Sequence, residues 1–66
     1  MAAPDSDIIR TLRHDLSNPL AAILAEAQLL LLNEATLDAE TLEGLREIES
    51  LARRMRDMLA ATRSNG

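Results

Sequence analysis

The sequence of 66 residues has no cysteine and no aromatic residue, and it contains only two glycines and two prolines. Without cysteine it can form neither a disulfide nor a thiolate metal site, and nothing argues for an oxidising compartment. Without aromatic rings, leucine, isoleucine and methionine must supply the hydrophobic packing. Two glycines cannot form a glycine-rich loop around a triphosphate, so we expect this chain to bind no cofactor of its own.

Lysine is also absent, and the seven arginines face eleven acids, for a net charge of −4. An acidic chain is poorly suited to nucleic acid, because phosphate backbones bind positive surfaces. The first four residues have neither the basic nor the apolar part of a secretion signal. The longest apolar stretch, residues 20–32, is interrupted by Glu26 and Gln28 and is too short to span a bilayer. We expect a soluble, cytoplasmic segment without membrane contact, although a longer parent protein could carry an anchor elsewhere.

What the sequence does contain is a helical pattern. Hydrophobic residues make up 47% of the chain, mostly leucine and alanine, which favour helices. In the first half they recur in steps of three and four, which predicts a helix over about residues 6–32. Ile8, Leu24 and Leu31 widen this stripe, as suits a helix that touches two neighbours in a bundle. The stripe consists of Ile9, Leu12, Leu16, Leu20, Ile23, Ala27 and Leu30.

The second half predicts another helix over about residues 37–62. Between the two, residues 33–36 form a short loop, in which Asn33 can take the left-handed conformation that ends helices and Thr36 can cap the next one. Residues 1–5 should be a frayed, disordered N-terminus, and 63–66 a tail. The apolar face of the second helix consists of Leu45, Ile48, Leu51, Ala52, Met55, Met58 and Leu59.

These elements predict an all-α fold. A connection this short makes the helices antiparallel neighbours, which gives a helical hairpin. Two helices cannot enclose a core, and 66 residues are few for a stable single domain. We therefore expect two copies of the hairpin to associate into a homodimeric four-helix bundle.

One stretch of the first helix carries candidate chemistry. It holds the only histidine, His14, followed by Asp15, Asn18 and Pro19. On a helical wheel Asn18 lies roughly 40° from His14, whereas Leu12, Leu16 and Ile23 lie near the opposite side. The imidazole should therefore face outward from a helix whose other side is buried. Pro19 cannot donate a hydrogen bond to the carbonyl of Asp15, so we predict a kink there, at a cost of about 3 kcal/mol in an ordinary helix.

Residues 14–20, His-Asp-Leu-Ser-Asn-Pro-Leu, resemble the H-box of sensor histidine kinases, and the similarity extends from about Ser6 to Thr62. The resemblance implies the dimerisation and phosphoacceptor domain of a two-component system. A separate catalytic domain, which binds ATP and Mg²⁺, would phosphorylate His14. His14 would then donate the phosphoryl group to an aspartate on the receiver domain of a response regulator. By resemblance, Asp15 would orient the imidazole or take its proton, and Asn18 would position water for dephosphorylation.

The motif departs from the usual pattern at two positions. Ser17 stands where a basic residue is frequent, and Arg13 stands where serine is frequent. Arg13 and Ser17 are only about 40° apart on the wheel, so we predict that Arg13 supplies the missing positive charge. Three alanines on the histidine side, at positions 21, 22 and 25, either leave a docking surface or simply favour the helix. Without a second histidine or any cysteine, no metal site is expected.

Two other function classes remain open. The chain could be a non-catalytic dimerisation module, or an inhibitor that mimics this domain to bind a kinase or response regulator. The sequence predicts part of a histidine protein kinase, which is a phosphotransferase. Because the ATP-binding domain is missing, the chain alone should be a phosphoryl acceptor and donor without autonomous kinase activity. Its length suggests a domain taken from a longer protein.

Overall fold

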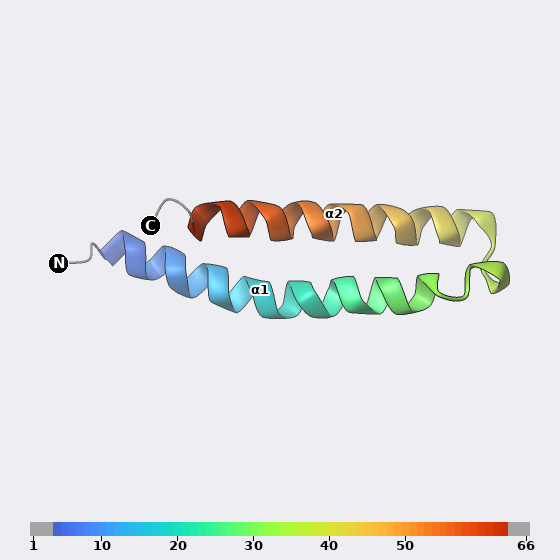
Figure 1. Ribbon diagram of the computed structural model, residues 1–66, viewed down its shortest axis with the longest axis horizontal. Helices are drawn as coiled ribbons and strands as arrows, with labels where there is room; N and C mark the ends of the chain where they lie inside the picture. The colour runs from blue at the N-terminus through green and yellow to red at the C-terminus, as the bar shows by residue number, and fades with distance from the viewer. Residues whose placement is uncertain (1–3, 64–66) are drawn as a thin grey trace.

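The computed structural model describes residues 4–63, which form two long helices and a short connection. Helix α1 spans Pro4–Leu31, the 3₁₀ helix η1 spans Glu34–Thr36, and helix α2 spans Ala39–Arg63. The two long helices run side by side in opposite directions (Figure 1), in a rod of 54 × 15 × 14 Å. The predicted all-α helical hairpin is confirmed.

The helix ends lie within two residues of the predicted ones. Helix α1 already includes Pro4 and Asp5, which we had assigned to a frayed N-terminus. Proline is well suited to the first turn of a helix, because its fixed φ is helical and its missing N–H would have no intrahelical partner. Arg63, predicted to begin the tail, belongs to α2. The remaining predicted end segments, residues 1–3 and 64–66, lie outside the described residues.

The connection differs from the prediction at Asn33. Its φ is −109°, and no non-glycine residue within the described range has a positive φ, so α1 does not end in the left-handed conformation. Instead, α1 ends in 3₁₀-type hydrogen bonds, in which each N–H donates to the carbonyl three residues earlier. The N–H groups of Leu32 and Asn33 donate to Leu29 and Leu30, and that of Thr36 donates to Asn33. Such tightening satisfies carbonyls at a helix end without a left-handed residue.

The cap of α2 is Asp38 and not Thr36. The backbone N–H of Thr41 donates to the Asp38 carboxylate at 2.7 Å, which is the bond of an N-cap residue. The hydroxyl of Thr36 instead donates to the carbonyl of Asn33 within the connection. Hydrogen bonds from the side chain and the backbone of Thr41 lower the pKa of Asp38. The helix therefore begins two residues later than predicted.

The hairpin by itself buries very little. Only Leu20, Leu24, Ala27 and Ala52 are buried among the described side chains, and the partly buried Leu59 packs against the cluster that Leu20, Leu24 and Ala52 form. The rest of the predicted apolar stripe is about half exposed, including Leu12, Leu16 and Ile23, which we had expected to be buried. The apolar stripe of each helix is wider than the other helix of the hairpin can cover. The uncovered parts of the two stripes lie side by side and form an apolar face.

This apolar face is lined by both helices. One groove of about 290 Å³ lies between Leu16, Pro19 and Ile23 of α1 and Ile48, Leu51 and Met55 of α2. A second groove continues it toward the connection, past Ala22, Leu30 and Leu45. Although this face is apolar, neither helix within residues 4–63 is long and apolar enough to cross a membrane.

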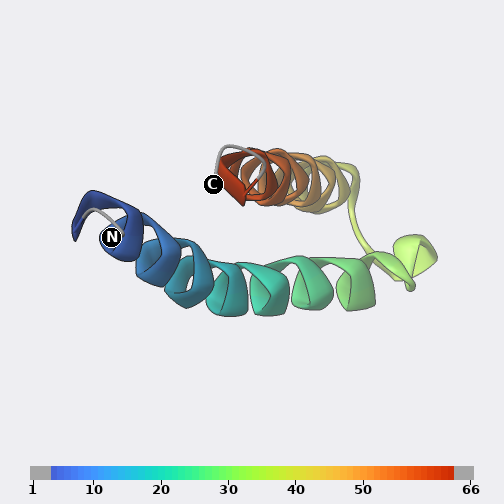
Figure 2. The same ribbon diagram turned by 60° about the vertical axis from the view of Figure 1, so that its left-hand side comes forward.

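Helix α1 continues through Pro19 and is curved, with its N-terminal turns inclined to the rest (Figure 2). Two features near the bend account for it. Pro19 withholds a hydrogen bond from the carbonyl of Asp15 and crowds it. Two residues earlier, the Ser17 hydroxyl donates to the carbonyl of Arg13 at 2.6 Å, a bond that also tends to bend helices. Both features follow His14 within five residues, so the bend lies just after the histidine.

The Asp38 cap predicts a pH dependence of stability. Because the folded pKa of Asp38 lies below its ordinary value of 3.8, the carboxylate stabilises the fold above that pH. The contribution is lost as the pH falls through the lower, folded pKa. We expect Asp38→Ala to lower the melting temperature at pH 7, and the difference from wild type to shrink as the pH falls below 3.8.

Thermal unfolding followed by circular dichroism between pH 2 and pH 7 measures this effect. Asp38→Asn is the matched control, because asparagine caps helices about as well but does not titrate. Its difference from Asp38→Ala should stay nearly constant with pH, because neither side chain titrates, whereas wild type should lose stability relative to both variants as the pH falls. A difference between Asp38→Ala and wild type that is the same at every pH would contradict the assigned role.

Candidate functional site

The His14 side chain projects into solvent from the N-terminal half of α1. It is 77% exposed, and the neighbouring Asp15 side chain is 67% exposed. The predicted outward orientation of the imidazole is therefore confirmed. Its Nδ1 atom lies 3.6 Å from an Asp15 carboxylate oxygen, which is beyond hydrogen-bond distance but close enough for a small rotation to make the bond.

The other residues of the motif lie within two turns of His14. Asn18 is exposed one turn later on nearly the same face, where its amide makes no hydrogen bond to residues 4–63. An amide in this position can donate to, or accept from, a water molecule next to the ring. The structure thus brings His14, Asp15 and Asn18 together on one exposed surface of α1.

Arg13 is placed less favourably than the sequence suggested. It is about 100° around the helix from His14, on the side that faces α2, and it is half-buried while His14 is exposed. Its guanidinium makes no ion pair within the described part of the chain. The 40° separation from Ser17 holds, but the Ser17 hydroxyl is already bonded to the Arg13 carbonyl.

A groove begins one turn after His14, between α1 and α2. Its volume is about 140 Å³, and Ser17, Ala21, Ala25 and Gln28 of α1 line it together with Arg56 of α2. Two of the three alanines that we singled out therefore line this groove. The third, Ala22, lies against the apolar face on the other side of the helix. The small side chains leave α1 open to an approaching surface beside the histidine.

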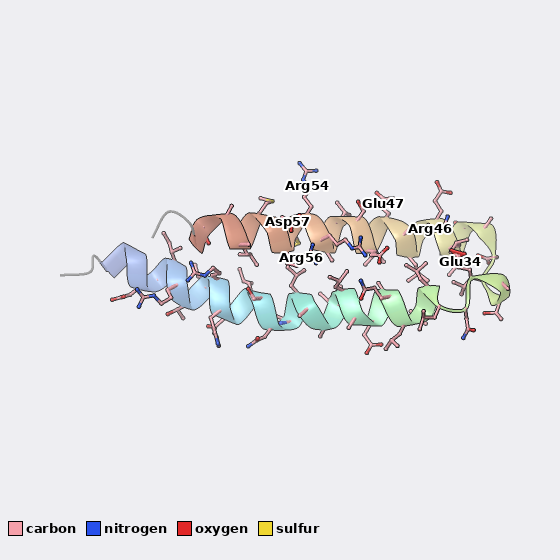
Figure 3. All side chains as sticks on the ribbon, in the orientation of Figure 1. Glu34, Arg46, Glu47, Arg54, Arg56 and Asp57 are labelled. Carbon is pink, nitrogen blue, oxygen red and sulfur yellow. The ribbon has the colours of Figure 1, made fainter. Side chains whose placement is uncertain are left out.

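The charged residues of α2 were the least predictable part of the site. Arg56 forms an exposed ion pair with Asp57 at 3.3 Å and lies toward α1, whereas Arg54 projects away from α1 (Figure 3). An ion pair that the sequence analysis missed joins Arg46 to Glu34 and ties η1 to α2. Their separation of twelve residues has no helical period, so only the path of the connection brings them together. Exposed pairs of this kind contribute at most about 1 kcal/mol.

The arrangement of His14 and Asp15 is suited to nucleophilic chemistry at the imidazole. Within residues 4–63, no three His, Asp or Glu side chains gather closely enough to hold a metal ion. The exposed imidazole is the side chain here best suited to act as a nucleophile, because a neutral imidazole keeps a lone pair on one ring nitrogen. An acid beside one ring nitrogen can hold its proton and leave the other nitrogen free to react.

A comparison with protein families agrees with this geometry. The sequence profile described as "His Kinase A (phospho-acceptor) domain" matches residues 5–63, which is nearly the whole chain. No curated protein and no solved structure matches the chain. Domains of this family act in histidine kinases of two-component signalling, and paired hairpins in a four-helix bundle are typical of them. The chain belongs to the His Kinase A phosphoacceptor domain family.

Proposed function

We propose that this chain accepts a phosphoryl group on His14 and donates it to an aspartate of a response-regulator receiver domain. The observation that carries the proposal is the 77% exposure of the only imidazole, in a chain that belongs to this family. In the first step a ring nitrogen bonds to the γ-phosphorus of ATP, the bond to the bridging oxygen breaks, and ADP leaves. A separate catalytic domain would bind the ATP and Mg²⁺.

Asp15 assigns different roles to the two ring nitrogens. Its carboxylate is 3.6 Å from Nδ1, so closure of this gap would hold a proton on Nδ1 and leave the Nε2 lone pair for attack. Nε2 is on the other side of the ring from Nδ1, where the exposed side chain leaves it open to a partner domain. In the second step the nitrogen–phosphorus bond breaks, its electron pair returns to the ring, and a carboxylate oxygen of the receiver bonds to phosphorus.

Asn18 has a role in the reverse direction of signalling. We infer that its amide positions a water molecule for removal of the phosphoryl group from the receiver. Its exposure one turn from His14 and its lack of an internal hydrogen bond within residues 4–63 support this role. The supporting charge of Arg13 stays a prediction, and the half-buried position of that side chain gives it little support.

The apolar face requires a partner, and we propose that it is the same face of a second copy. A two-fold axis parallel to the helices places α1 of one hairpin opposite α2 of the other, so that both rows of apolar residues face each other. His14 stays on the outside of this arrangement. The homodimer leaves the histidine accessible to a catalytic domain and a receiver.

Phosphorylation of the chain by ATP and a histidine-kinase ATP-binding domain tests the function. We expect radiolabel from the γ-phosphate on the wild type and none on His14→Gln, because no other imidazole is present. Asp15→Asn should slow labelling about 100-fold, the lower end of the effect of a positioned acid or base. Equal labelling of His14→Gln and wild type would refute the assignment and leave the chain a dimerisation module or inhibitor.

The role of Asn18 is tested by release of phosphate from a phosphorylated receiver domain. Asn18→Ala should slow the release that this chain promotes by about 10-fold or more, because the attacking water loses its position, while phosphorylation of His14 is unchanged. Gln28→Ala is the matched control, since it removes another exposed amide on the same side of α1. Equal rates in Asn18→Ala and Gln28→Ala would contradict the role.

A charge on the apolar face tests the dimer. Ile23→Glu should weaken self-association at least about 100-fold in sedimentation equilibrium, because an unpaired carboxylate would be desolvated in the interface. Leu32→Glu is the matched control: Leu32 is 79% exposed and lines neither groove of the apolar face. An Ile23→Glu variant that associates as tightly as Leu32→Glu would rule out this interface.

A further inference from the structure

Three arginines lie in the same part of the hairpin as His14, and they differ in their access to its ring. Arg10 and Arg13 precede His14 on α1, and Arg56 lies across the groove on α2. Ser17 occupies the motif position where a basic residue is frequent, and its hydroxyl is bonded to a backbone carbonyl. A phosphoryl group on His14 would carry a charge of about −1.5 to −2 at neutral pH. Because the motif of this chain has no basic residue at position 17, another cation would have to neutralise the phosphoryl group.

Two of the three arginines are poorly placed to reach a phosphoryl group on His14. Arg13 lies about 100° from His14, on the half-buried side that faces α2. Arg56 lines the groove beside Ser17 and Gln28, on the connection side of His14. Side chains lean toward the N-terminus of their own helix, and α2 runs antiparallel to α1, so Arg56 leans away from the histidine.

Arg10 is well placed. It precedes His14 by four residues, which puts the two Cβ atoms about 5–6 Å apart on one face of the helix. The imidazole leans toward the N-terminus of α1, over the turn that contains Arg10, and Arg10 leans the same way, toward Asp7, so its long side chain must turn back to reach the ring. Arg10 is 69% exposed, and its one ion pair within the described residues joins it to Asp7 at 3.8 Å. Such a long, exposed pair holds the guanidinium weakly, so it is free to turn to another anion.

We propose that Arg10 binds the phosphoryl group carried by His14 and supplies the positive charge that Ser17 does not. This inference rests on the proposed function of His14. Phosphorylation would draw the Arg10 guanidinium away from Asp7, since a dianion with three acceptor oxygens makes stronger charge-assisted hydrogen bonds than one exposed carboxylate. Of the other charged groups nearby, Asp15 opposes the effect, while Arg13 and Arg56 lie on the side of α2. Arg10 is a phosphoryl-binding residue and transfers no proton.

The ionisation of the phosphoryl group reports this contact. Potassium phosphoramidate phosphorylates imidazole directly, with loss of ammonia, and the single histidine makes the product unambiguous. Titration followed by ³¹P NMR gives the pKa of the phosphoryl group, which a nearby cation lowers. At low salt, Arg10→Gln should raise this pKa by about 0.3–0.5 unit, as expected for one charge about 6 Å away in water. At about 1 M salt most of this difference should disappear.

Matched variants separate this contact from a general effect of charge. Arg10→Lys should keep the wild-type pKa of the phosphoryl group because it keeps the positive charge. Arg13→Gln and Arg54→Gln should also keep it, because Arg13 lies on the side that faces α2 and Arg54 projects away from α1 (Figure 3). Adding Ser17→Arg to Arg10→Gln should restore it by returning a cation to the other side of His14. An unchanged pKa in Arg10→Gln, or an equal rise in Arg13→Gln, would overturn the proposal. Chemical phosphorylation needs no kinase, so this result is independent of whether ATP-dependent labelling of His14 succeeds.

Discussion

The stability of the hairpin is limited by the small apolar area that its two helices bury against each other. Two antiparallel helices without an aromatic residue bury only four side chains among those described, and two of these are alanines. The conformational entropy of ordering about 60 residues is far larger than burial of this size can offset. The apolar face is therefore required for stability, and it must be covered when the domain is folded. This requirement determines which side of α1 can be used for chemistry.

The location of the reactive residue follows from that requirement. Because Leu16 and Ile23 belong to the face that must be covered, the side of α1 that carries His14 is the one left in solvent. On the proposed function, His14 meets a catalytic domain and a receiver in turn, and an exposed helix surface flanked by small alanines permits both encounters. The bend of α1 lies near Ser17 and Pro19, next to this exposed surface.

Periodicity predicted what depends on the local sequence. It identified both helices, the outward imidazole and the apolar residues, because each depends only on spacing along one helix. It could not say which apolar residues the partner helix covers, so Leu12, Leu16 and Ile23 were expected to be buried and are about half exposed. That division depends on the rotation of each helix about its axis, which the connection sets.

The connection was the part predicted least well, for a related reason. Thr36 and Asp38 are both residue types that favour the N-cap position. Asp38 is the cap because residues 34–36 form a 3₁₀ turn, so α2 begins only after it. The ion pair between Glu34 and Arg46 has no periodic signal at all. Similarly, Arg13 was selected because it lies about 40° from Ser17 on the helical wheel, whereas Arg10 is closer to His14 on the helix surface.

The central claim is that one side of α1 is covered by a second hairpin while the opposite side presents a reactive ring to solvent. Proton relaxation caused by a soluble gadolinium chelate measures both sides in one experiment. The account predicts strong relaxation at the His14 ring and at the Leu32 methyl groups, and weak relaxation at the methyl groups of Ile23 and Ile48. Methyl groups of Ile23 and Ile48 relaxed as strongly as those of Leu32, or a shielded His14 ring, would contradict it.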